Sequence, residues 1–498
     1  MVAKVKTFAF LGTKALNVDA QVRISAGRAN FSIVGLADKA VAESKERVRA
    51  AIGSLGLALP FENITVNLAP ADLVKEGSHF DLPIAVGLLI EMGALKQEDV
   101  REFYVLGELS LDSAINKING ILPAAIEASA QDCGIICPAK CGTEARWAGD
   151  DLAILAPENL LQLVNHFKGL QILSDPVLDL QRQEIKYPDL IDIKGQQSAK
   201  RALEIAAAGG HNMLMMGPPG TGKSMLASRL VGITPPPDTA EMLEINMIHS
   251  ISGNVEDGNL ISARPFRDPH HSCSMPSMVG GGTKARPGEV SLAHKGILFL
   301  DELAEFPRQV LDSLRQPIEN GNITISRVQS HVNYPADFQL VAAMNPCRCG
   351  YLGEGGRECT RAPKCGQDYQ AKISGPLMDR MDIIIQVPQI DIFAPESEVG
   401  ESSAAVLSRV KNARDVQKKR YEDAANSLNS RANGQILEKY TKIDDESTAM
   451  LKKAIEKMGI SIRGYNRILR VARTIADLDG KENIEQDHLM EAISYRRF

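Results

Sequence analysis

The sequence lacks the features that mark membrane, secreted and fibrous proteins. No apolar run reaches the roughly 18 residues of a membrane span, and the N-terminal segment has no long apolar core. Eight cysteines in 498 residues are too few for a disulfide scaffold, and only 5% of the residues are aromatic. The net charge of −6 excludes a globally basic nucleic-acid coat. We therefore expect a cytoplasmic protein of about two to four domains with no membrane contact.

The residue pattern divides the chain into four stretches. Residues 1–170 alternate β-rich runs with helical patterns, which predicts an α+β domain, and residues 171–190 contain Pro176 and Pro188 and are predicted to form a linker. Residues 191–395 alternate strands and helices, as an open α/β sheet does. Residues 396–498 are predicted to be helical, because apolar side chains recur there at three- and four-residue spacing. That stripe consists of Ile462, Tyr465, Leu469, Ala472, Ile475 and Ala476.

A glycine-rich segment after the apolar run Met213-Leu-Met-Met fits the pattern GxxxxGK[ST], and a helical pattern follows it. In that context backbone N–H groups wrap the phosphates of ATP, Lys223 reaches the β- and γ-oxygens, and Ser224 ligates Mg²⁺. A chance glycine-rich turn is the alternative, which the flanking strand and helix patterns argue against. The predicted phosphate-binding residues are Gly217, Pro218, Pro219, Gly220, Thr221, Gly222, Lys223 and Ser224.

Two later apolar runs end in polar residues suited to phosphoryl transfer. The first ends in Asp301, which would hold Mg²⁺, and Glu302, which would polarise the attacking water. The second ends in Asn345, whose amide would orient water near the γ-phosphate. Phosphoryl transfer also needs positive charge, for which Arg380 and Arg463 are the candidates. A surface ion pair is the alternative for each arginine.

Four cysteines, Cys347, Cys349, Cys359 and Cys365, fall within 19 residues of a loop rich in glycine and arginine. Four thiolates at this spacing predict a structural Zn²⁺ site, with free reduced thiols as the alternative. Cys133, Cys137 and Cys141 flank an apolar strand pattern and are predicted to be core residues. The pair His270 and His271 is expected to be packed or hydrogen-bonded rather than a second metal site, and Cys273 has no assigned role.

Together these residues resemble the AAA+ ATPases of the branch that contains magnesium-chelatase subunits and minichromosome-maintenance helicases. The stretches RPFRDPHHSCSMPSMVGGGTKARPGEVSLAHKGILFLDELAEF and LRQPIENGNITISRVQSHVNYPADFQLVAAMNPCRCG are similar to the Mg-chelatase-like ComM/YifB family. The resemblance implies an AAA+ α/β core with chelatase-type insertions, a C-terminal helical lid and a ring, expected to be a homo-hexamer. It also implies that a neighbouring subunit donates Arg380, and that Arg463 is the sensor arginine, with Arg467 as the competing choice.

The N-terminal zone resembles the Lon-type protease domain. The stretches ENITVNLAPADLVKEGSHFDLPIAVGLLI and GELSLDSAINKINGILPAAIEASAQDCGIICP parallel the two halves of its catalytic region. Covalent catalysis there needs a serine activated by a lysine. Asp81 falls near the serine position, the lysine is missing after Gly120, and Ser78 and Lys117 are imperfect substitutes. The resemblance therefore implies a non-proteolytic domain used for assembly or partner binding.

Basic residues before the Asp301 strand are candidates for DNA binding. Residues 264–286 contain four basic residues against Asp268, a net charge of +3, and residues 322–334 are predicted to form a β-hairpin. In the resembling ATPases both segments project toward the ring pore, which suits a salt-dependent grip on single-stranded or branched DNA. Ordinary surface charge is the alternative. The predicted DNA contacts are Lys284, Arg286 and Arg327.

Two functions are compatible with these features. The resemblance implies an ATP-driven DNA motor, a branch-migration helicase or translocase that aids integration of donor DNA in natural transformation. The alternative is a chelatase-type or protein-remodelling ATPase that acts on a protein partner. The cysteine loop and the N-terminal domain favour the DNA motor, because chelatase ATPase subunits lack both.

Overall fold

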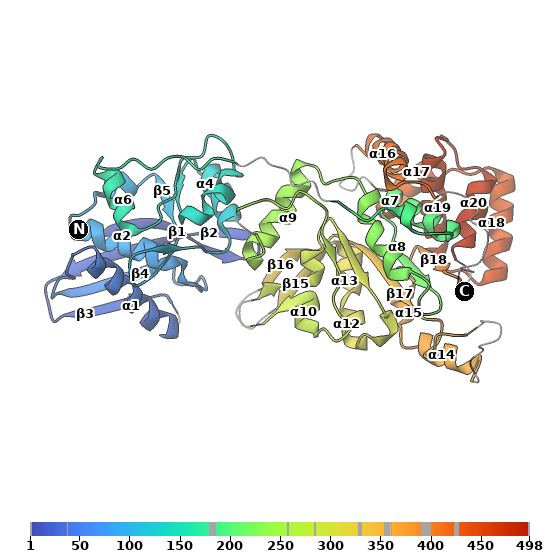
Figure 1. The fold of residues 1–498 in the computed structure, drawn as a ribbon, viewed down its shortest axis with the longest axis horizontal. Helices are drawn as coiled ribbons and strands as arrows, with labels where there is room; N and C mark the ends of the chain where they lie inside the picture. Colours follow the sequence, from blue (N-terminus) through green and yellow to red (C-terminus); the bar gives the residue numbers. More distant parts are fainter. Residues whose placement is uncertain are drawn as a thin grey trace.

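The structure of the chain is a computed structural model that describes residues 2–36, 38–178, 186–255, 258–282, 285–326, 331–352, 359, 361–389, 400–422 and 428–496. Figure 1 shows an elongated molecule with an N-terminal sheet domain, a central α/β part and a C-terminal group of helices in a row. Within the described ranges, no helix is both long and apolar enough to cross a membrane. Residues 171–178 of the predicted linker form no helix or strand, and residues 179–185 lie outside the described ranges.

The N-terminal domain is built on a seven-stranded sheet. Its strands are β1 (Ala3–Leu11), β2 (Lys14–Ser25), β3 (Asn30–Val34), β4 (Asn63–Ala69), β5 (Phe103–Val105), β8 (Gly134–Ile136) and β9 (Ile154–Leu155), beside the short pair β6 (Glu108–Leu109) and β7 (Ile115–Asn116). The strand order is β3-β4-β2-β1-β5-β8-β9. Side chains of β1 and β2 largely alternate between buried and exposed, so one sheet face supplies most of the core.

Helices cover that sheet. They are α1 (Asp38–Ser54), α2 (Asp81–Glu91), α3 (Gln97–Val100), α4 (Ile121–Ala130), α5 (Gly142–Arg146) and α6 (Leu160–Phe167). Helix α2 is buried over nine of its residues and packs on β1 and β2. Cys133, Cys137 and Cys141 are buried and free, as predicted, and burial raises the pKa of the Cys141 thiol to about 12.

The central part is an open parallel sheet, as predicted. Its strands are β10 (Met213–Met216), β11 (Phe266–Arg267), β14 (Ile297–Leu300), β17 (Gln339–Met344) and β18 (Ile383–Gln386), in the order β11-β14-β17-β10-β18. Strands β10, β14 and β17 are buried at every position, which explains their continuous apolar sequences. Alternate residues serve two cores: Met213 and Met215 face one, and Leu214 and Met216 face the other.

Each sheet face has its own cover. The core of Met213 and Met215 includes α7 (Gln197–Gly209), α8 (Lys223–Arg229) and the C-terminal helices. The core of Leu214 and Met216 includes side chains from most of the insertions between strands. These are α10 (Met275–Val279), β12 (Gly280–Gly281), β13 (Arg286–Pro287), α11 (Glu289–Leu292), α12 (Arg308–Ser313), α13 (Arg315–Asn320), the hairpin β15 (Asn322–Ser326) and β16 (His331–Pro335), α14 (Lys364–Gln370) and α15 (Gly375–Met378).

The C-terminal part is helical, with α16 (Ser403–Arg420), α17 (Gly434–Tyr440), α18 (Asp445–Met458), α19 (Ile462–Leu478) and α20 (Gln486–Ser494). Helix α19 packs on α7 and α20 and buries Leu469, Ala472 and Ile475. The prediction for Ile462 was wrong: its side chain is 82% exposed. Ile462 is the first residue of α19, one turn before the helix enters the core, so periodicity alone overextends the stripe.

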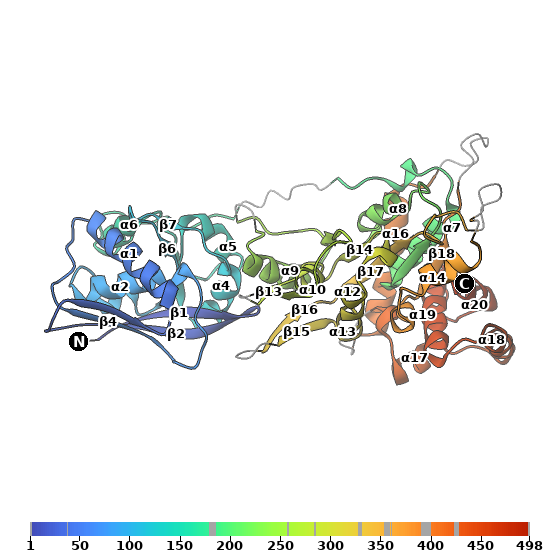
Figure 2. The same ribbon diagram turned by 90° about the horizontal axis from the view of Figure 1, so that it is seen from below.

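Among the described residues, the N-terminal domain contacts the central part near α9 and near β16. Helix α4 packs on α9 (Thr239–Ser252), where the Gly120 amide donates to the Ser250 carbonyl at 3.1 Å and the Ser250 hydroxyl donates to Glu144 at 2.5 Å. The turn between β1 and β2 also meets β16: a Cβ added to Gly12 would lie 2.9 Å from the Asn333 carbonyl oxygen. Both views show the β15–β16 hairpin extending toward the N-terminal domain (Figures 1 and 2).

Candidate functional site

The glycine-rich segment forms a tight turn between β10 and α8. Gly217 is required for close packing, because an added Cβ would lie 2.2 Å from the carbonyl oxygen of Val387, the residue that follows β18. Gly222, with φ of 85°, occupies the left-handed region directly before α8. The turn therefore ends at a helix N-terminus, where free N–H groups attract phosphate.

Lys223 is buried inside this turn. Its ammonium donates to the carbonyls of Gly217 at 2.8 Å and Pro218 at 2.7 Å, and Asn345 Oδ1 accepts at 3.4 Å. Burial lowers the pKa of Lys223, and the charge of Asp301 opposes that shift. The structure thus brings together the predicted lysine and the predicted amide from β10 and β17, which are neighbouring strands.

Ser224 and Asp301 are also in contact. The Ser224 hydroxyl donates to Asp301 Oδ2 at 2.6 Å, and the Glu302 amide donates to Asp301 Oδ1 at 2.8 Å. A hydroxyl and a carboxylate at this spacing are the oxygen ligands that Mg²⁺ takes beside phosphates. Glu302 has φ of 52°, an uncommon backbone conformation that tends to persist at functional sites.

His271 is a neighbour of Glu302 that the sequence reasoning missed. Its Nδ1 lies 3.4 Å from Glu302 Oε2, and its ring packs against His270 with centroids 4.1 Å apart. The packing of the two rings agrees with the prediction for this pair. The contact with Glu302 arises because β11, which precedes the histidines, pairs with β14 and ends at the same sheet edge. Such adjacency appears only once the strand order is known.

The predicted arginines lie at the opposite edge of the sheet, which is formed by the amino ends of its parallel strands. A cavity of about 560 Å³ opens where the strands begin, lined by Asn212 before β10 and Asp337 before β17. The strands between the two edges are four to six residues long, at least about 13 Å. Arg380 and Arg463 are therefore brought together, but not with Lys223 of their own chain. The arginines that line the cavity are Arg380, Arg431, Arg463, Arg467 and Arg470.

Three of these arginines are held by carboxylates, and Arg431 pairs with Asp337. Arg380 forms an ion pair with Glu319 and donates to the Pro376 carbonyl at 2.5 Å. Arg467 lies 3.3 Å from Asp382, and burial lowers the pKa of its guanidinium. Arg463 is exposed at the first turn of α19. The cavity is thus lined by positive groups that the acidic side chains only partly balance.

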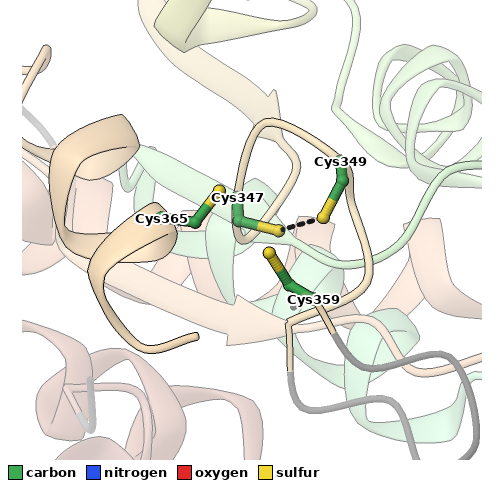
Figure 3. Close-up of side chains that lie close together, drawn as sticks. All are labelled: Cys347, Cys349, Cys359 and Cys365. Atoms are coloured by element: carbon green, nitrogen blue, oxygen red, sulfur yellow. Dashed lines mark hydrogen bonds between the residues drawn. The ribbon is translucent and has the colours of Figure 1, made fainter. Parts of the chain in front are cut away.

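The four cysteines of the loop form one cluster after β17 (Figure 3). Their sulfur atoms lie within 4.8 Å of one another, and the sulfurs of Cys347 and Cys349 are 3.1 Å apart. A tetrahedral zinc site with Zn–S of about 2.3 Å has sulfurs about 3.8 Å apart, so the cluster fits Zn²⁺. Burial would raise the pKa of Cys347, but hydrogen bonds from Cys349 and from backbone amides outweigh it and lower the pKa.

The cysteine loop lies against the phosphate-binding turn. A Cβ added to Gly350 would approach Pro219 Cδ to 2.6 Å, and Cys347 follows Asn345 by two residues. Any ion held by the cluster would therefore support the backbone beside the nucleotide site.

Comparison with known proteins gives the family of this chain. The family model "Magnesium chelatase, subunit ChlI" matches residues 189–394, and models for two other parts of that subunit match residues 20–141 and 400–496. The competence protein ComM of Haemophilus influenzae is 42% identical over 496 residues, covering 98% of this chain and 96% of the relative. Protein YifB of Salmonella typhimurium is 42% identical over 99% of this chain and 97% of the relative. The chain belongs to the ComM/YifB family.

The ComM/YifB relationship extends more weakly to chelatase subunits. The magnesium-chelatase 38 kDa subunit of Rhodobacter capsulatus is 24% identical over 336 residues, which cover 61% of this chain and 86% of that subunit. This member of the ComM/YifB family is therefore an AAA+ protein of the Mg-chelatase type that carries additional sequence.

The serine and lysine considered for proteolysis are engaged elsewhere in this ComM/YifB chain. Ser78 donates to Glu108, whereas Lys117 donates to the Val255 carbonyl of the central part at 2.6 Å. Asp81 accepts from Ser44 at 2.7 Å and from Arg47 at 2.5 Å, and burial raises the pKa of its carboxyl. These side chains have structural partners.

The basic segment supplies less free charge than its sequence indicates. Arg264 donates to Glu241 at 2.7 Å, and Arg267 forms a two-pronged ion pair with Glu289 at 2.7 and 2.9 Å. Arg286 is exposed on β13. Lys284 and Arg327, the other two predicted DNA contacts, lie outside the described residues.

Proposed function

We propose that the protein is an ATP-hydrolysing, ring-forming motor that acts on DNA. The observation that carries the proposal is the separation of two half-sites. The phosphate-binding turn with Asp301 and Asn345 lies at one edge of the parallel sheet, and the arginine-lined cavity lies at the other. Two chains side by side in one orientation would bring these edges together.

Within one half-site the residues have separate roles. Lys223 would bind the β- and γ-phosphates, and Ser224 with Asp301 would hold the Mg²⁺ that neutralises them. Glu302 would accept a proton from the attacking water, which Asn345 would orient. The imidazole of His271 lies 3.4 Å from the Glu302 carboxylate, so this contact would either break or persist during turnover.

Arg380 and Arg463 would complete the site of a neighbouring subunit. An arginine at the transferring phosphate stabilises charge that develops in the transition state. Since both arginines line the cavity at the far edge, their target would be the nucleotide of the next chain. A closed ring, expected to be a hexamer, satisfies this geometry for every chain, with Zn²⁺ in the cysteine cluster as a structural ion and α16–α20 as the lid.

DNA is the proposed substrate because the β15–β16 hairpin and the β12–β13 segment carry the predicted basic contacts and because of the name of one relative. Arg286 is exposed on β13, and Lys284 and Arg327 are the other two basic residues that the sequence prediction names. One relative over the full length is named a competence protein, which supports a role in competence. We infer that this role is branch migration or translocation during integration of donor DNA. The N-terminal domain, which we infer to be a non-proteolytic Lon-like domain, would serve assembly or partner binding.

Protein remodelling is the second candidate, favoured by the similarity to a chelatase subunit. ATP turnover measured without DNA and with single-stranded, duplex and branched DNA separates the two. The DNA motor predicts stimulation by at least one DNA form and displacement or branch migration of that substrate. Turnover that ignores all three DNA forms would favour a protein substrate.

A further inference from the structure

Arg380 is fixed to the base of the β15–β16 hairpin. Its guanidinium pairs with Glu319, which is the penultimate residue of α13, and α13 leads through Gly321 directly into β15. The Ala336 amide donates to the Gly321 carbonyl at 2.8 Å and closes the base. The hairpin base, residues 318–321 with Asp337, forms one wall of the arginine-lined cavity. The residue proposed to act on the next subunit is thus held by the element proposed to bind DNA.

A second arginine holds the same base more firmly. Arg431 donates to the Ile318 carbonyl at 3.0 Å and pairs with Asp337, which Lys295 also contacts at 3.0 Å. These contacts join both ends of the hairpin base to the helical part and to the sheet. Asp337 is 28% exposed, whereas Glu319 is 54% exposed and has one basic partner among the described residues. Arg380, the partner of Glu319, is buried. Because Asp337 has two basic partners among the described residues and Glu319 has one, the Glu319–Arg380 contact would break first when the hairpin shifts.

Apart from Glu319, the Arg380 side chain has few hydrogen-bond partners among the described residues. Its Nε is buried and has no hydrogen-bond partner among the described residues, although its Nη1 donates to Pro376 within the same turn. A guanidinium that loses Glu319 can offer its free donors to an anion entering the cavity.

We propose that Glu319 is a positioning residue that withholds Arg380 from the neighbouring nucleotide until the hairpin moves. Occupancy of the hairpin would pull α13, separate Glu319 from Arg380 and so speed hydrolysis in the next subunit. This inference rests on the proposed function, because it assumes that Arg380 serves ATP hydrolysis across the subunit boundary.

The test compares full-length wild type, Glu319→Gln and Glu46→Gln in ATP turnover with and without a mixed-sequence single-stranded oligonucleotide. Glu46 forms a single ion pair with Arg49 on the N-terminal domain, and both side chains are exposed. Glu319→Gln should raise kcat without DNA about two- to fivefold, because it removes one ion pair whose carboxylate is half exposed, and leave KM for ATP unchanged. Adding the oligonucleotide should then raise the kcat of Glu319→Gln only slightly. Glu319→Asp, whose shorter side chain cannot keep the same contact, should behave alike, and the Arg380→Ala, Glu319→Gln double variant should lose the gain. Glu46→Gln should match wild type.

Three outcomes decide the matter. DNA-free turnover of Glu319→Gln and Glu319→Asp equal to or below wild type, with Arg380→Ala inactive and all melting temperatures unchanged, would overturn the role of Glu319. Full turnover by Arg380→Ala would instead overturn the proposed function of Arg380. Raised turnover that the Arg380→Ala change does not abolish would also refute the proposal.

Discussion

Lys223 and Glu302 occupy one site but act on different steps. Lys223→Ala removes charge-assisted hydrogen bonds to the phosphates, each contributing roughly 1.5–3 kcal/mol, so nucleotide affinity should fall at least about a hundredfold. Glu302→Gln keeps the shape and loses the base, so the protein should bind ATP normally and hydrolyse it about 10²–10⁴ times more slowly. Equilibrium binding of a fluorescent ATP analogue and steady-state turnover separate the two effects.

Lys452→Ala is the control for these variants, since Lys452 is exposed on α18, far along the chain from the phosphate-binding turn. Wild-type turnover by Glu302→Gln would show that another group accepts the proton, and His271 would be the first to examine.

Single residues differ in how far sequence alone reveals them. The phosphate-binding turn could be predicted because its chemistry lies in consecutive residues with fixed spacing. The His271–Glu302 contact could not, because it depends on the pairing of β11 with β14. Arg264 and Arg267 contribute to the net charge of +3 that predicts DNA binding. Their carboxylate partners, Glu241 and Glu289, lie more than twenty positions away in the chain and neutralise them.

At the scale of elements, the cysteine loop joins a metal site to the nucleotide site. We expect about one zinc per chain by elemental analysis, because four sulfurs within 4.8 Å suit tetrahedral coordination. Cys359→Ser should lower the zinc content and also weaken ATP binding, since the loop supports Asn345 and packs on Pro219 through Gly350. Cys273→Ser, which lies outside the cluster, should retain both. Undiminished zinc in Cys359→Ser would mean that the ligand set is different.

The hairpin and the β12–β13 segment form the proposed DNA grip. Replacing Lys284, Arg286 and Arg327 by alanine should weaken single-stranded DNA binding about equally for all sequences. The slope of log affinity against log salt should fall by about 2, since each neutralised phosphate contributes about 0.7. Fluorescence anisotropy over a salt series measures both quantities.

The matched control neutralises three exposed lysines of α18, Lys452, Lys453 and Lys457. It should change neither affinity nor slope, and both triple variants should keep DNA-free ATP turnover. Equal losses of DNA affinity in the two triple variants would mean that DNA binding depends on overall charge and not on these segments.

Elements were predicted well where periodicity and burial coincide. Within the β-rich pattern predicted for residues 1–170, Val22–Ile24, Phe31–Val34 and Ile64–Leu68 lie in strands, because buried apolar residues alternate there with less buried ones. Periodicity failed at Ile462, where a helix begins before its core does. The sheet edge on which Arg380 lies could not be read from the sequence, since that requires the strand order.

At the scale of the whole molecule, the proposed site needs two chains. Lys223→Ala and Arg380→Ala proteins should each be inactive alone. Mixed, they should recover part of the wild-type turnover, because some interfaces then combine an intact phosphate-binding turn with an intact Arg380. ATPase assays over a range of mixing ratios, with co-assembly verified by mass photometry, test this. A co-assembled mixture as inactive as its parents would exclude action across the boundary.

The placement of the two half-sites at opposite edges of one sheet also determines how many complete sites an assembly contains. In an open row of n chains, n − 1 phosphate-binding turns face the arginines of a neighbour, and one turn at the end faces none. Closure adds the missing site without adding a chain. Turnover per chain would therefore rise with protein concentration and reach its limit only when the row closes. A small fraction of chains with both half-sites disabled would reduce activity through every ring that they enter.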